Sequence, residues 1–206
     1  MPLVMNLLRL SLVLALFGCA TMNQSECLNA DWFLVGLEDG SRGYPVSQIG
    51  KHRKACAEYQ ISPDFSQYEK GHSDGLQLFC TERNGFLLGN RGGQYSGVCP
   101  PDIEPAFLNG YQSGRELFAA SKNAKQAASA LKSLQEETER LRDQISRKEQ
   151  LLVSDQTSEA SRLRLLEDIR ADENKLSELE TKLTELEQEQ ADKQYEYERL
   201  KNLSDF

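Results

Sequence analysis

Glycine, proline and cysteine are all missing from residues 116–206 of this 206-residue chain. The same segment carries 15 lysines and arginines and 21 aspartates and glutamates. Because it contains neither of the residues that most often break helices or form tight turns, it is expected to be one kind of helical element repeated. Residues 20–115 hold 13 of the 14 glycines, five of the six prolines and the single tryptophan. The composition therefore predicts a small compact domain followed by a long helical region.

Motifs that carry chemistry are also scarce. The chain has two histidines, no phosphate loop ending in Gly-Lys-Ser/Thr and no His-Glu-x-x-His zinc motif. His52 lies in the one basic cluster, residues 51–54, which is expected to be a solvated helix face, and His72 has no partner at catalytic spacing. Asp39 and Asp74 each precede a glycine, as turn or cap residues often do. We therefore predict no catalytic residue, no metal and no cofactor.

A surplus of positive charge is absent as well. The formal net charge is −8, and acidic residues are spread along the chain. Since nucleic-acid binding needs a basic surface, the composition argues against such a partner. The apolar run Leu10–Phe17 has eight residues, follows Arg9 and ends at Gly18-Cys19. It is too short to span a membrane and has the size of the apolar part of a secretory signal peptide.

Leu16, Phe17, Gly18 and Cys19 resemble the lipobox of bacterial lipoproteins. The resemblance implies that residues 1–18 are a signal peptide and that the Cys19 thiol carries lipid, including palmitate-type acyl chains. Several such chains hold a protein on a membrane almost permanently. In lipoproteins of the enteric type, aspartate after the cysteine retains the protein in the inner membrane. Ala20 therefore implies the outer membrane, with the chain on its periplasmic face.

The N-terminal half shows a degenerate repeat, in which an aromatic residue is followed by glycine three and seven positions later. The three copies are Phe33-Gly36-Gly40, Tyr68-Gly71-Gly75 and Phe107-Gly110-Gly114. Glycines four apart share one helix face, which favours tight helix–helix packing over a ligand groove. Helices are expected near residues 30–39, 46–59 and 63–79, with a fourth from about Pro105. The glycine-rich residues 84–97 are expected to form turns and a short hairpin.

Four cysteines remain once Cys19 is assigned to lipid: Cys27, Cys56, Cys80 and Cys99. An even number in an exported chain predicts two disulfides, with three connectivities open. No two of these cysteines have the two-to-four-residue spacing of structural zinc sites. The expected helices favour Cys27–Cys56, across an antiparallel helix pair, and Cys80–Cys99, across the glycine-rich loop.

Aromatic, glycine and cysteine positions carry a second resemblance. They are Trp32, Gly36, Asp39-Gly40, Gly43, the stretch Tyr68–Gly75 with Leu76 and Cys80, and Gly97-Val98-Cys99-Pro100. Over roughly residues 26–118 the chain resembles an uncharacterised group of bacterial lipoproteins, domain of unknown function 2799. The resemblance implies an envelope location and no established activity, and the helical tail is an addition to the pattern.

Apolar residues of the C-terminal half fall in two heptad registers typical of a coiled coil. The first has Leu131, Leu134, Leu141, Ile145 and Leu152 at a and d, with Thr138 and Lys148 as polar exceptions; the second has Leu165, Ile169, Leu176, Leu179, Leu183, Leu186, Tyr197 and Leu200, interrupted by Arg162, Asp172, Gln190 and Lys193. The registers disagree by three residues across 153–161. Either the chain turns back there as an antiparallel hairpin, or one helix of about 90 residues pairs with other subunits. We favour the hairpin.

The sequence thus predicts a mainly α protein in four parts. These are the signal peptide 1–18, a lipidated N-terminus and short linker 19–29, a small glycine-rich disulfide-bonded domain 30–115, and a coiled-coil region 116–206 with a break near 153–161. We expect a non-catalytic structural or protein-interaction module, whose coiled coil binds an envelope protein. The alternative is a glycan- or peptidoglycan-binding module, with Trp32, Phe86, Tyr95 and Tyr111 as its candidate surface.

Overall fold

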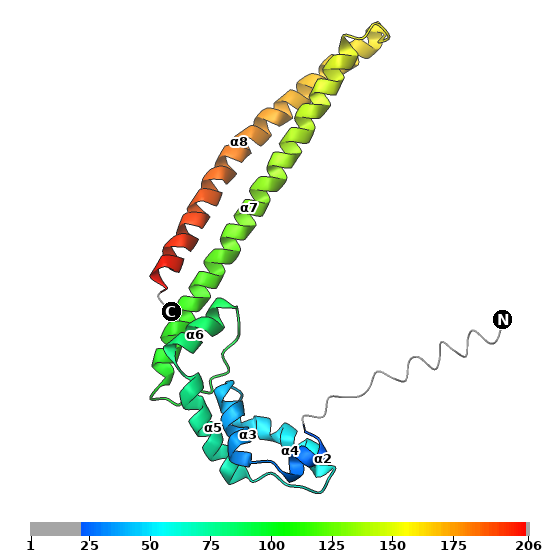
Figure 1. The fold of residues 1–206 in the computed structure, drawn as a ribbon. Coiled ribbons are helices and arrows are strands. Elements are labelled where there is room, and N and C mark those ends of the chain that lie inside the picture. The colour runs from blue at the N-terminus through cyan, green and yellow to red at the C-terminus, as the bar shows by residue number, and fades with distance from the viewer. Residues whose placement is uncertain (1–21, 205–206) are drawn as a thin grey trace, which may run out of the picture. The chain divides into compact units, whose positions relative to one another are not determined.

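A computed structural model describes residues 22–204, and these residues form helices and connecting loops without strands (Figure 1). In chain order the elements are α2 (Gln24–Leu28), α3 (Trp32–Ser41), the 3-10 helix η1 (Val46–Gln48), α4 (Ile49–Ala57), α5 (Phe65–Phe79), α6 (Glu82–Asn90), α7 (Glu104–Leu152) and α8 (Glu159–Leu203). The predicted fold class is confirmed. No helix in the described range is both long and apolar enough to cross a membrane. The expected signal peptide, Cys19 and Ala20 lie outside that range.

Two compact units divide the chain. Within the described range, the first contains residues 22–84 together with Tyr95–Leu108, and the second contains Gly85–Gln94 and residues 109–204. The division passes through α7, whereas the composition changes near Arg115. Each unit holds a closely packed pair of helices, and we describe the units separately.

In the first unit, α3 and α5 touch backbone to backbone. A Cβ atom added at Gly36 or Gly40 would overlap the carbonyl oxygens of Tyr68 and His72, respectively. One added at Gly71 or Gly75 would in turn overlap carbonyl oxygens of α3. Because the contacts advance in the same direction along both helices, α3 and α5 are parallel. Each glycine lowers helix propensity by about 1 kcal/mol relative to alanine, so close packing must offset that cost.

The second unit repeats this arrangement with α6 and α7. A Cβ added at Gly89 would overlap the Tyr111 carbonyl oxygen, and one at Gly114 would overlap the Phe86 carbonyl oxygen. Gly89 lies 49 positions after Gly40, and Gly114 lies 39 positions after Gly75. In the first pair, Gly40 contacts His72 and Gly75 contacts Leu37. Adding 39 to 72 gives Tyr111, and adding 49 to 37 gives Phe86, which are the residues that Gly89 and Gly114 contact in the second pair. The two helix pairs therefore share one packing register.

The turns that follow the two pairs match as well. Gly43 and Gly92 both have positive φ, +72° and +73°, and a side chain at either would strike a phenyl ring, Phe79 in the first pair and Phe118 in the second. His72 Nε2 donates to the Tyr44 carbonyl (2.7 Å), and the equivalent Tyr111 hydroxyl donates to the Gly93 carbonyl (3.0 Å). The globular region is thus an internal duplication of a parallel helix pair.

The prediction of turns across residues 84–97 is wrong at its start, because residues up to Asn90 are helical. Thr81 Oγ1 accepts from the Asn84 amide near the first turn of α6. Gly85 and Gly89 are buried, and close packing against α7 stabilises a helix that its glycines disfavour. They form a fourth glycine pair that the repeat analysis missed, because Glu82 stands where the other copies have an aromatic residue.

Aspartate caps set the starts of α3 and α5. Asp31 Oδ1 accepts from the amides of Phe33 and Leu34, so α3 begins at Trp32, two residues later than expected. Asp64 Oδ1 accepts from the Gln67 amide at the start of α5. Each cap satisfies amides that have no partner inside the helix.

Both disulfides lie in the first unit. Cys27 bonds to Cys56, linking α2 to α4 with 5.6 Å between Cα atoms, and Cys80 bonds to Cys99 with 5.7 Å. This is the connectivity that the sequence favours. Around the first bridge, a small core gathers Met22, Ala55, Ala30, Trp32, Tyr59 and Ile61. In so small a unit, each bridge contributes stability on the order of 2–4 kcal/mol.

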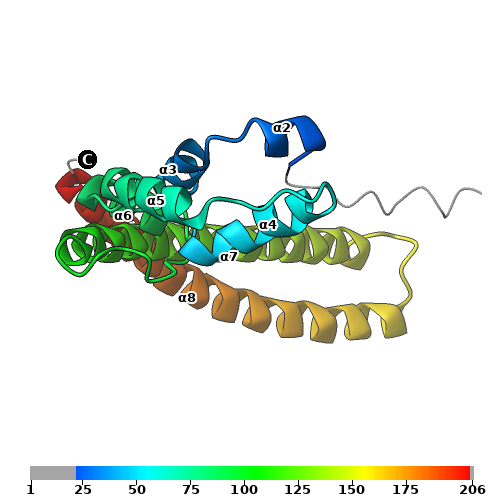
Figure 2. The same ribbon diagram turned by 90° about the horizontal axis from the view of Figure 1, so that it is seen from below.

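In the second unit, α7 and α8 lie side by side and antiparallel, joined by the turn at residues 153–158 (Figure 1, Figure 2). The predicted hairpin is confirmed. Its core contains the predicted a and d residues: Leu141, Ile145, Ile169 and Leu179 are buried, with Leu134, Leu152 and Leu176 packed against them. Ser158 caps α8 by accepting from the Ser161 amide, which explains why the register changes there.

Two of the polar residues that interrupt the heptad pattern, Lys148 and Asp172, form an ion pair with each other. Lys148 Nζ of α7 lies 2.6 Å from Asp172 Oδ2 of α8, and their side chains are only 22% and 17% exposed. Arg142–Glu180 (2.8 Å) and Lys175–Glu137 (3.1 Å) also join the two helices. A charged pair on an apolar seam disfavours shifted alignments, since a shift would leave both charges unpaired.

The glycine contacts predict a large difference between two substitutions of the same kind. Gly71→Ala places a methyl group on the Phe33 carbonyl and should destabilise the first unit by about 1–3 kcal/mol. Gly50→Ala in α4, where a Cβ meets nothing within 4 Å, should be neutral or stabilise by up to about 1 kcal/mol. Urea unfolding followed by Trp32 fluorescence measures both. Equal stabilities for the two variants would contradict close backbone packing.

The Lys148–Asp172 pair predicts a pH-dependent contribution to hairpin stability. The hydrogen bond from Lys148 is the main cause that lowers the pKa of Asp172 below its ordinary 3.8. The ion pair therefore contributes its full stabilisation at pH values above 3.8, and this stabilisation is lost as the pH falls through the lower pKa that Asp172 has in the folded protein. Lys148→Met should reduce the loss of stability below about pH 5. It should also cost more at pH 7 than Arg140→Met, which breaks an exposed pair with Glu136. Thermal unfolding followed by circular dichroism at several pH values tests this, and identical pH profiles for wild type and Lys148→Met would refute it.

Candidate functional site

Three polar side chains meet inside the first unit. Asp39 of α3 is 6% exposed, and its Oδ2 accepts from the hydroxyl of Tyr68 (2.8 Å) and from Nε2 of His52 (2.8 Å). Tyr68 is fully buried, and the Nδ1 atom of His52 has no hydrogen-bond partner. Burial, and next the bond to Asp39, raise the pKa of Tyr68 far above its usual 10, so the hydroxyl remains a donor.

The duplicated pair lacks this cluster. By the same offsets, Leu88 stands at the position of Asp39 and Phe107 at that of Tyr68. One backbone arrangement thus accommodates polar side chains in one copy and apolar ones in the other. The hydrogen bonds of the first copy are therefore not a general requirement of this helix packing.

Two expectations about these residues are corrected. His52 is buried, although its neighbours Lys51, Arg53 and Lys54 are exposed as the solvated-face interpretation requires. Its helix turns the imidazole inward, where Asp39 accepts a hydrogen bond from it. Asp39 is neither a turn nor a cap residue, because it lies within α3 and its buried carboxylate accepts hydrogen bonds from Tyr68 and His52.

The polar residues do not converge on a cleft. His72 lines a depression of about 480 Å³ together with Glu69, Ser73 and residues 96–98, and neither Asp39 nor His52 reaches it. Asp74 is exposed on α5. No group of three or more metal-ligating side chains is present among residues 22–204. The arrangement gives no sign of catalysis.

The four aromatic residues of the candidate glycan surface contribute to packing within their units. Trp32 packs on the core around Cys27–Cys56, and Phe86 is buried. The Tyr95 hydroxyl donates to Glu104 (2.8 Å) and accepts from the Cys99 amide. The Tyr111 hydroxyl donates to the Gly93 carbonyl. A ligand at these rings would compete with internal contacts.

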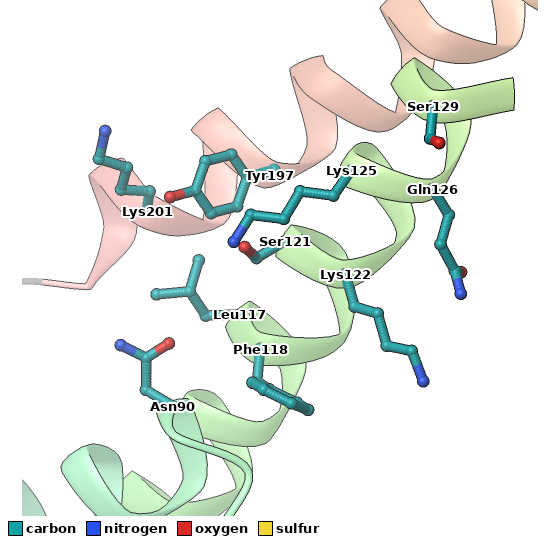
Figure 3. A pocket seen from close by; sticks show the side chains of 10 residues that line it. All are labelled: Asn90, Leu117, Phe118, Ser121, Lys122, Lys125, Gln126, Ser129, Tyr197 and Lys201. Atoms are coloured by element: carbon teal, nitrogen blue, oxygen red, sulfur yellow. The ribbon is translucent and has the colours of Figure 1, made fainter. Parts of the chain in front are cut away.

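A groove of about 650 Å³ lies in the second unit beside the last turns of α8 (Figure 3). Its lining residues are Asn90 of α6, Leu117, Phe118, Ser121, Lys122, Lys125, Gln126 and Ser129 of α7, and Tyr197 and Lys201 of α8. Within residues 22–204, three lysines and no carboxylate line it, in a chain whose net charge is −8. The sequence analysis did not predict this groove. The absence of aspartate and glutamate from residues 117–135 could have indicated a segment of positive charge there.

Exposed apolar side chains gather at the opposite end of the hairpin, where α7 ends and α8 begins. Val153 is 78% and Leu163 62% exposed, and Leu151 and Leu166 are also exposed. We call these four residues the hairpin tip. The turn between them is ordered: Thr157 Oγ1 donates to the Leu151 carbonyl (2.7 Å), and Arg162 Nη2 donates to the Ser154 carbonyl (3.1 Å).

Comparison with known families gives a match for the N-terminal half. Residues 31–116 match the family described as "Protein of unknown function (DUF2799)", which confirms the resemblance noted in the sequence. The matched region contains all eight glycines of the two packed helix pairs and ends before most of the hairpin. Searches among curated proteins and among solved structures found no match.

The buried cluster predicts non-additive effects of substitution. Asp39→Leu removes the acceptor for two buried donors and should cost about 2–4 kcal/mol. Adding Tyr68→Phe removes one stranded donor and should restore about 1 kcal/mol, because the pair then matches Leu88 and Phe107 of the second copy. Tyr44→Phe, at an exposed ring, serves as the control. Urea unfolding followed by Trp32 fluorescence measures all four proteins, and a double variant less stable than Asp39→Leu would contradict this account.

Proposed function

We propose that this chain, in which residues 31–116 form a domain of the DUF2799 family, is a non-catalytic lipoprotein of the cell envelope that binds another protein through its helical hairpin. The observation that carries the proposal is the exposed apolar tip of an ordered hairpin. The glycine-packed pair of α6 and α7 serves as the folded base from which α7 extends.

The tip has the properties of a docking surface. Apolar side chains on both helices flank a turn that side-chain hydrogen bonds hold in place, so a partner would meet a preformed surface. Single exposed leucines are common on proteins, whereas four exposed apolar residues on the two sides of one turn favour a contact site. The 45 residues of α8 rise about 68 Å, which separates the tip from the other end of that helix.

The proposed location is the periplasmic face of the outer membrane, where lipid on Cys19 would anchor the chain. Supporting this, the two disulfides fit an oxidising compartment. The lipobox-like residues Leu16–Cys19 supply the attachment chemistry, and Ala20 favours the outer membrane over the inner. Palmitate labelling of wild type and Cys19→Ser tests the anchor by itself, and labelling of both proteins would exclude Cys19.

The docking proposal is tested by photocrosslinking in intact bacterial cells. A photoreactive amino acid at Val153 should yield a discrete protein adduct, whereas the same amino acid at Leu203, which is 69% exposed, should not. Val153→Ser with Leu163→Ser should reduce recovery of that partner about tenfold or more, since apolar anchors dominate such contacts. Tyr195→Ser with Leu203→Ser is the matched control.

Two outcomes would count against the tip. Equal adducts from positions 153 and 203 would show that exposure alone governs cross-linking. Co-sedimentation of the chain with cell-wall sacculi, unaffected by the tip substitutions and without any protein adduct, would favour the peptidoglycan-binding alternative.

A further inference from the structure

We propose that the groove lined by Lys122, Lys125 and Tyr197 binds an amphipathic anion, in which a carboxylate or phosphate is joined to a hydrocarbon chain. This site is independent of the hairpin tip. The inference rests on the charge of the groove, on its apolar floor and on its size (Figure 3).

The charge comes mainly from α7. Lys122 and Lys125 are exposed and belong to none of the ion pairs of the described residues, although the chain has an excess of acids. Lys201 of α8 is partly neutralised, because its Nζ lies 3.5 Å from Glu198. Two ammonium groups on consecutive turns of α7 therefore remain for an anionic ligand.

Two carboxylates of the last turns of α8 are already paired with basic side chains, and one of these pairs includes Lys201, which lines the groove. On α8, Glu196 lies 2.8 Å from Arg199, and Glu198 pairs with Lys201. Two further grooves run along the same helices, and each includes acidic side chains: Glu116, Asp192 and Glu196 in one, and Glu189 in the other. Among the described residues that line these three grooves, carboxylates are absent only from the groove in Figure 3, and a negative ligand group is favoured there.

The floor of the groove is apolar. Leu117 is buried, Phe118 is 36% exposed, and the ring of Tyr197 faces the groove with Lys201 Nζ 5.8 Å from its centroid. A small hydrophilic anion would leave this surface wet, whereas a hydrocarbon chain would cover it. The combination of lysines and an apolar floor therefore favours a ligand that has both an anionic group and a hydrocarbon chain.

The size fits a small molecule. The volume of about 650 Å³ falls within the range of about 300–1,000 Å³ that is usual for small-ligand sites. A single acyl chain with an acidic head can enter such a groove from solvent. Free fatty acids and phospholipid-derived single-chain phosphates share this chemistry, so the test must separate the head group from the chain.

Calorimetric titration of the full chain carrying Cys19→Ser, so that no acyl chain of its own competes, tests the proposal. Dodecanoate and dodecyl phosphate, below their micellar concentrations, should bind saturably, and the stronger of the two identifies the preferred head group. Inorganic phosphate and neutral dodecyl maltoside should each bind at least about tenfold more weakly. Tight binding of either would overturn the requirement for both characters.

Lys122→Gln with Lys125→Gln should weaken dodecanoate binding by about tenfold, because it removes both unpaired ammonium groups. Lys132→Gln with Lys182→Gln is the matched control, since it changes the net charge equally at exposed lysines of the same helices outside the groove. Equal weakening by the two double variants, or no saturable binding to the parent chain, would reject the site. Circular dichroism of each variant checks that the hairpin is intact.

Discussion

Backbone-to-backbone contact between parallel helices is the constraint on which the rest of this fold depends. Gly36, Gly40, Gly71 and Gly75 leave no room for side chains between α3 and α5, and the contact fixes the register of the two helices. That register places Tyr68 beside Asp39 and His72 beside the Tyr44 carbonyl. The same contact recurs between α6 and α7, so it also fixes the base from which the long helix continues. A methyl group at one glycine would disturb contacts well beyond its own turn.

Comparing the two copies of the helix pair shows which features the close helix packing requires and which features can vary. Glycine, the positive-φ turn and the phenyl ring over that turn are present in both copies. The polar cluster of Asp39, His52 and Tyr68 occurs only in the first. In the second copy, α7 runs on for many turns and pairs with α8, whereas α5 ends at Phe79. The two copies have thus diverged, one toward an internal hydrogen-bonded cluster and the other toward an extended arm.

The arm itself has two regions with different physical character. Toward its tip, leucine and isoleucine fill the seam, and ion pairs such as Lys148–Asp172 join the helices. Toward the other end, α7 presents the buried alanines Ala120, Ala124 and Ala127 instead of leucines. The three grooves lie along the same part of the hairpin. The proposed docking tip thus follows the leucine-rich part of the seam, and the proposed ligand groove lies along the alanine-rich part.

Local patterns in the sequence predicted the heptad helices, and they favoured the reversal near residue 153 and the observed disulfide pairing without excluding a continuous helix or the other two connectivities. Heptad spacing, capping residues and cysteine placement act over short distances, which is why these predictions could be made. The character of α6 required the tertiary structure, since its glycines indicate turns until a second helix is packed against them. The burial of His52 within a basic cluster and the meeting of Lys122, Lys125 and Tyr197 around one groove were also decided only in three dimensions. Each depends on which face of a helix another helix covers, and that information lies in residues distant along the chain.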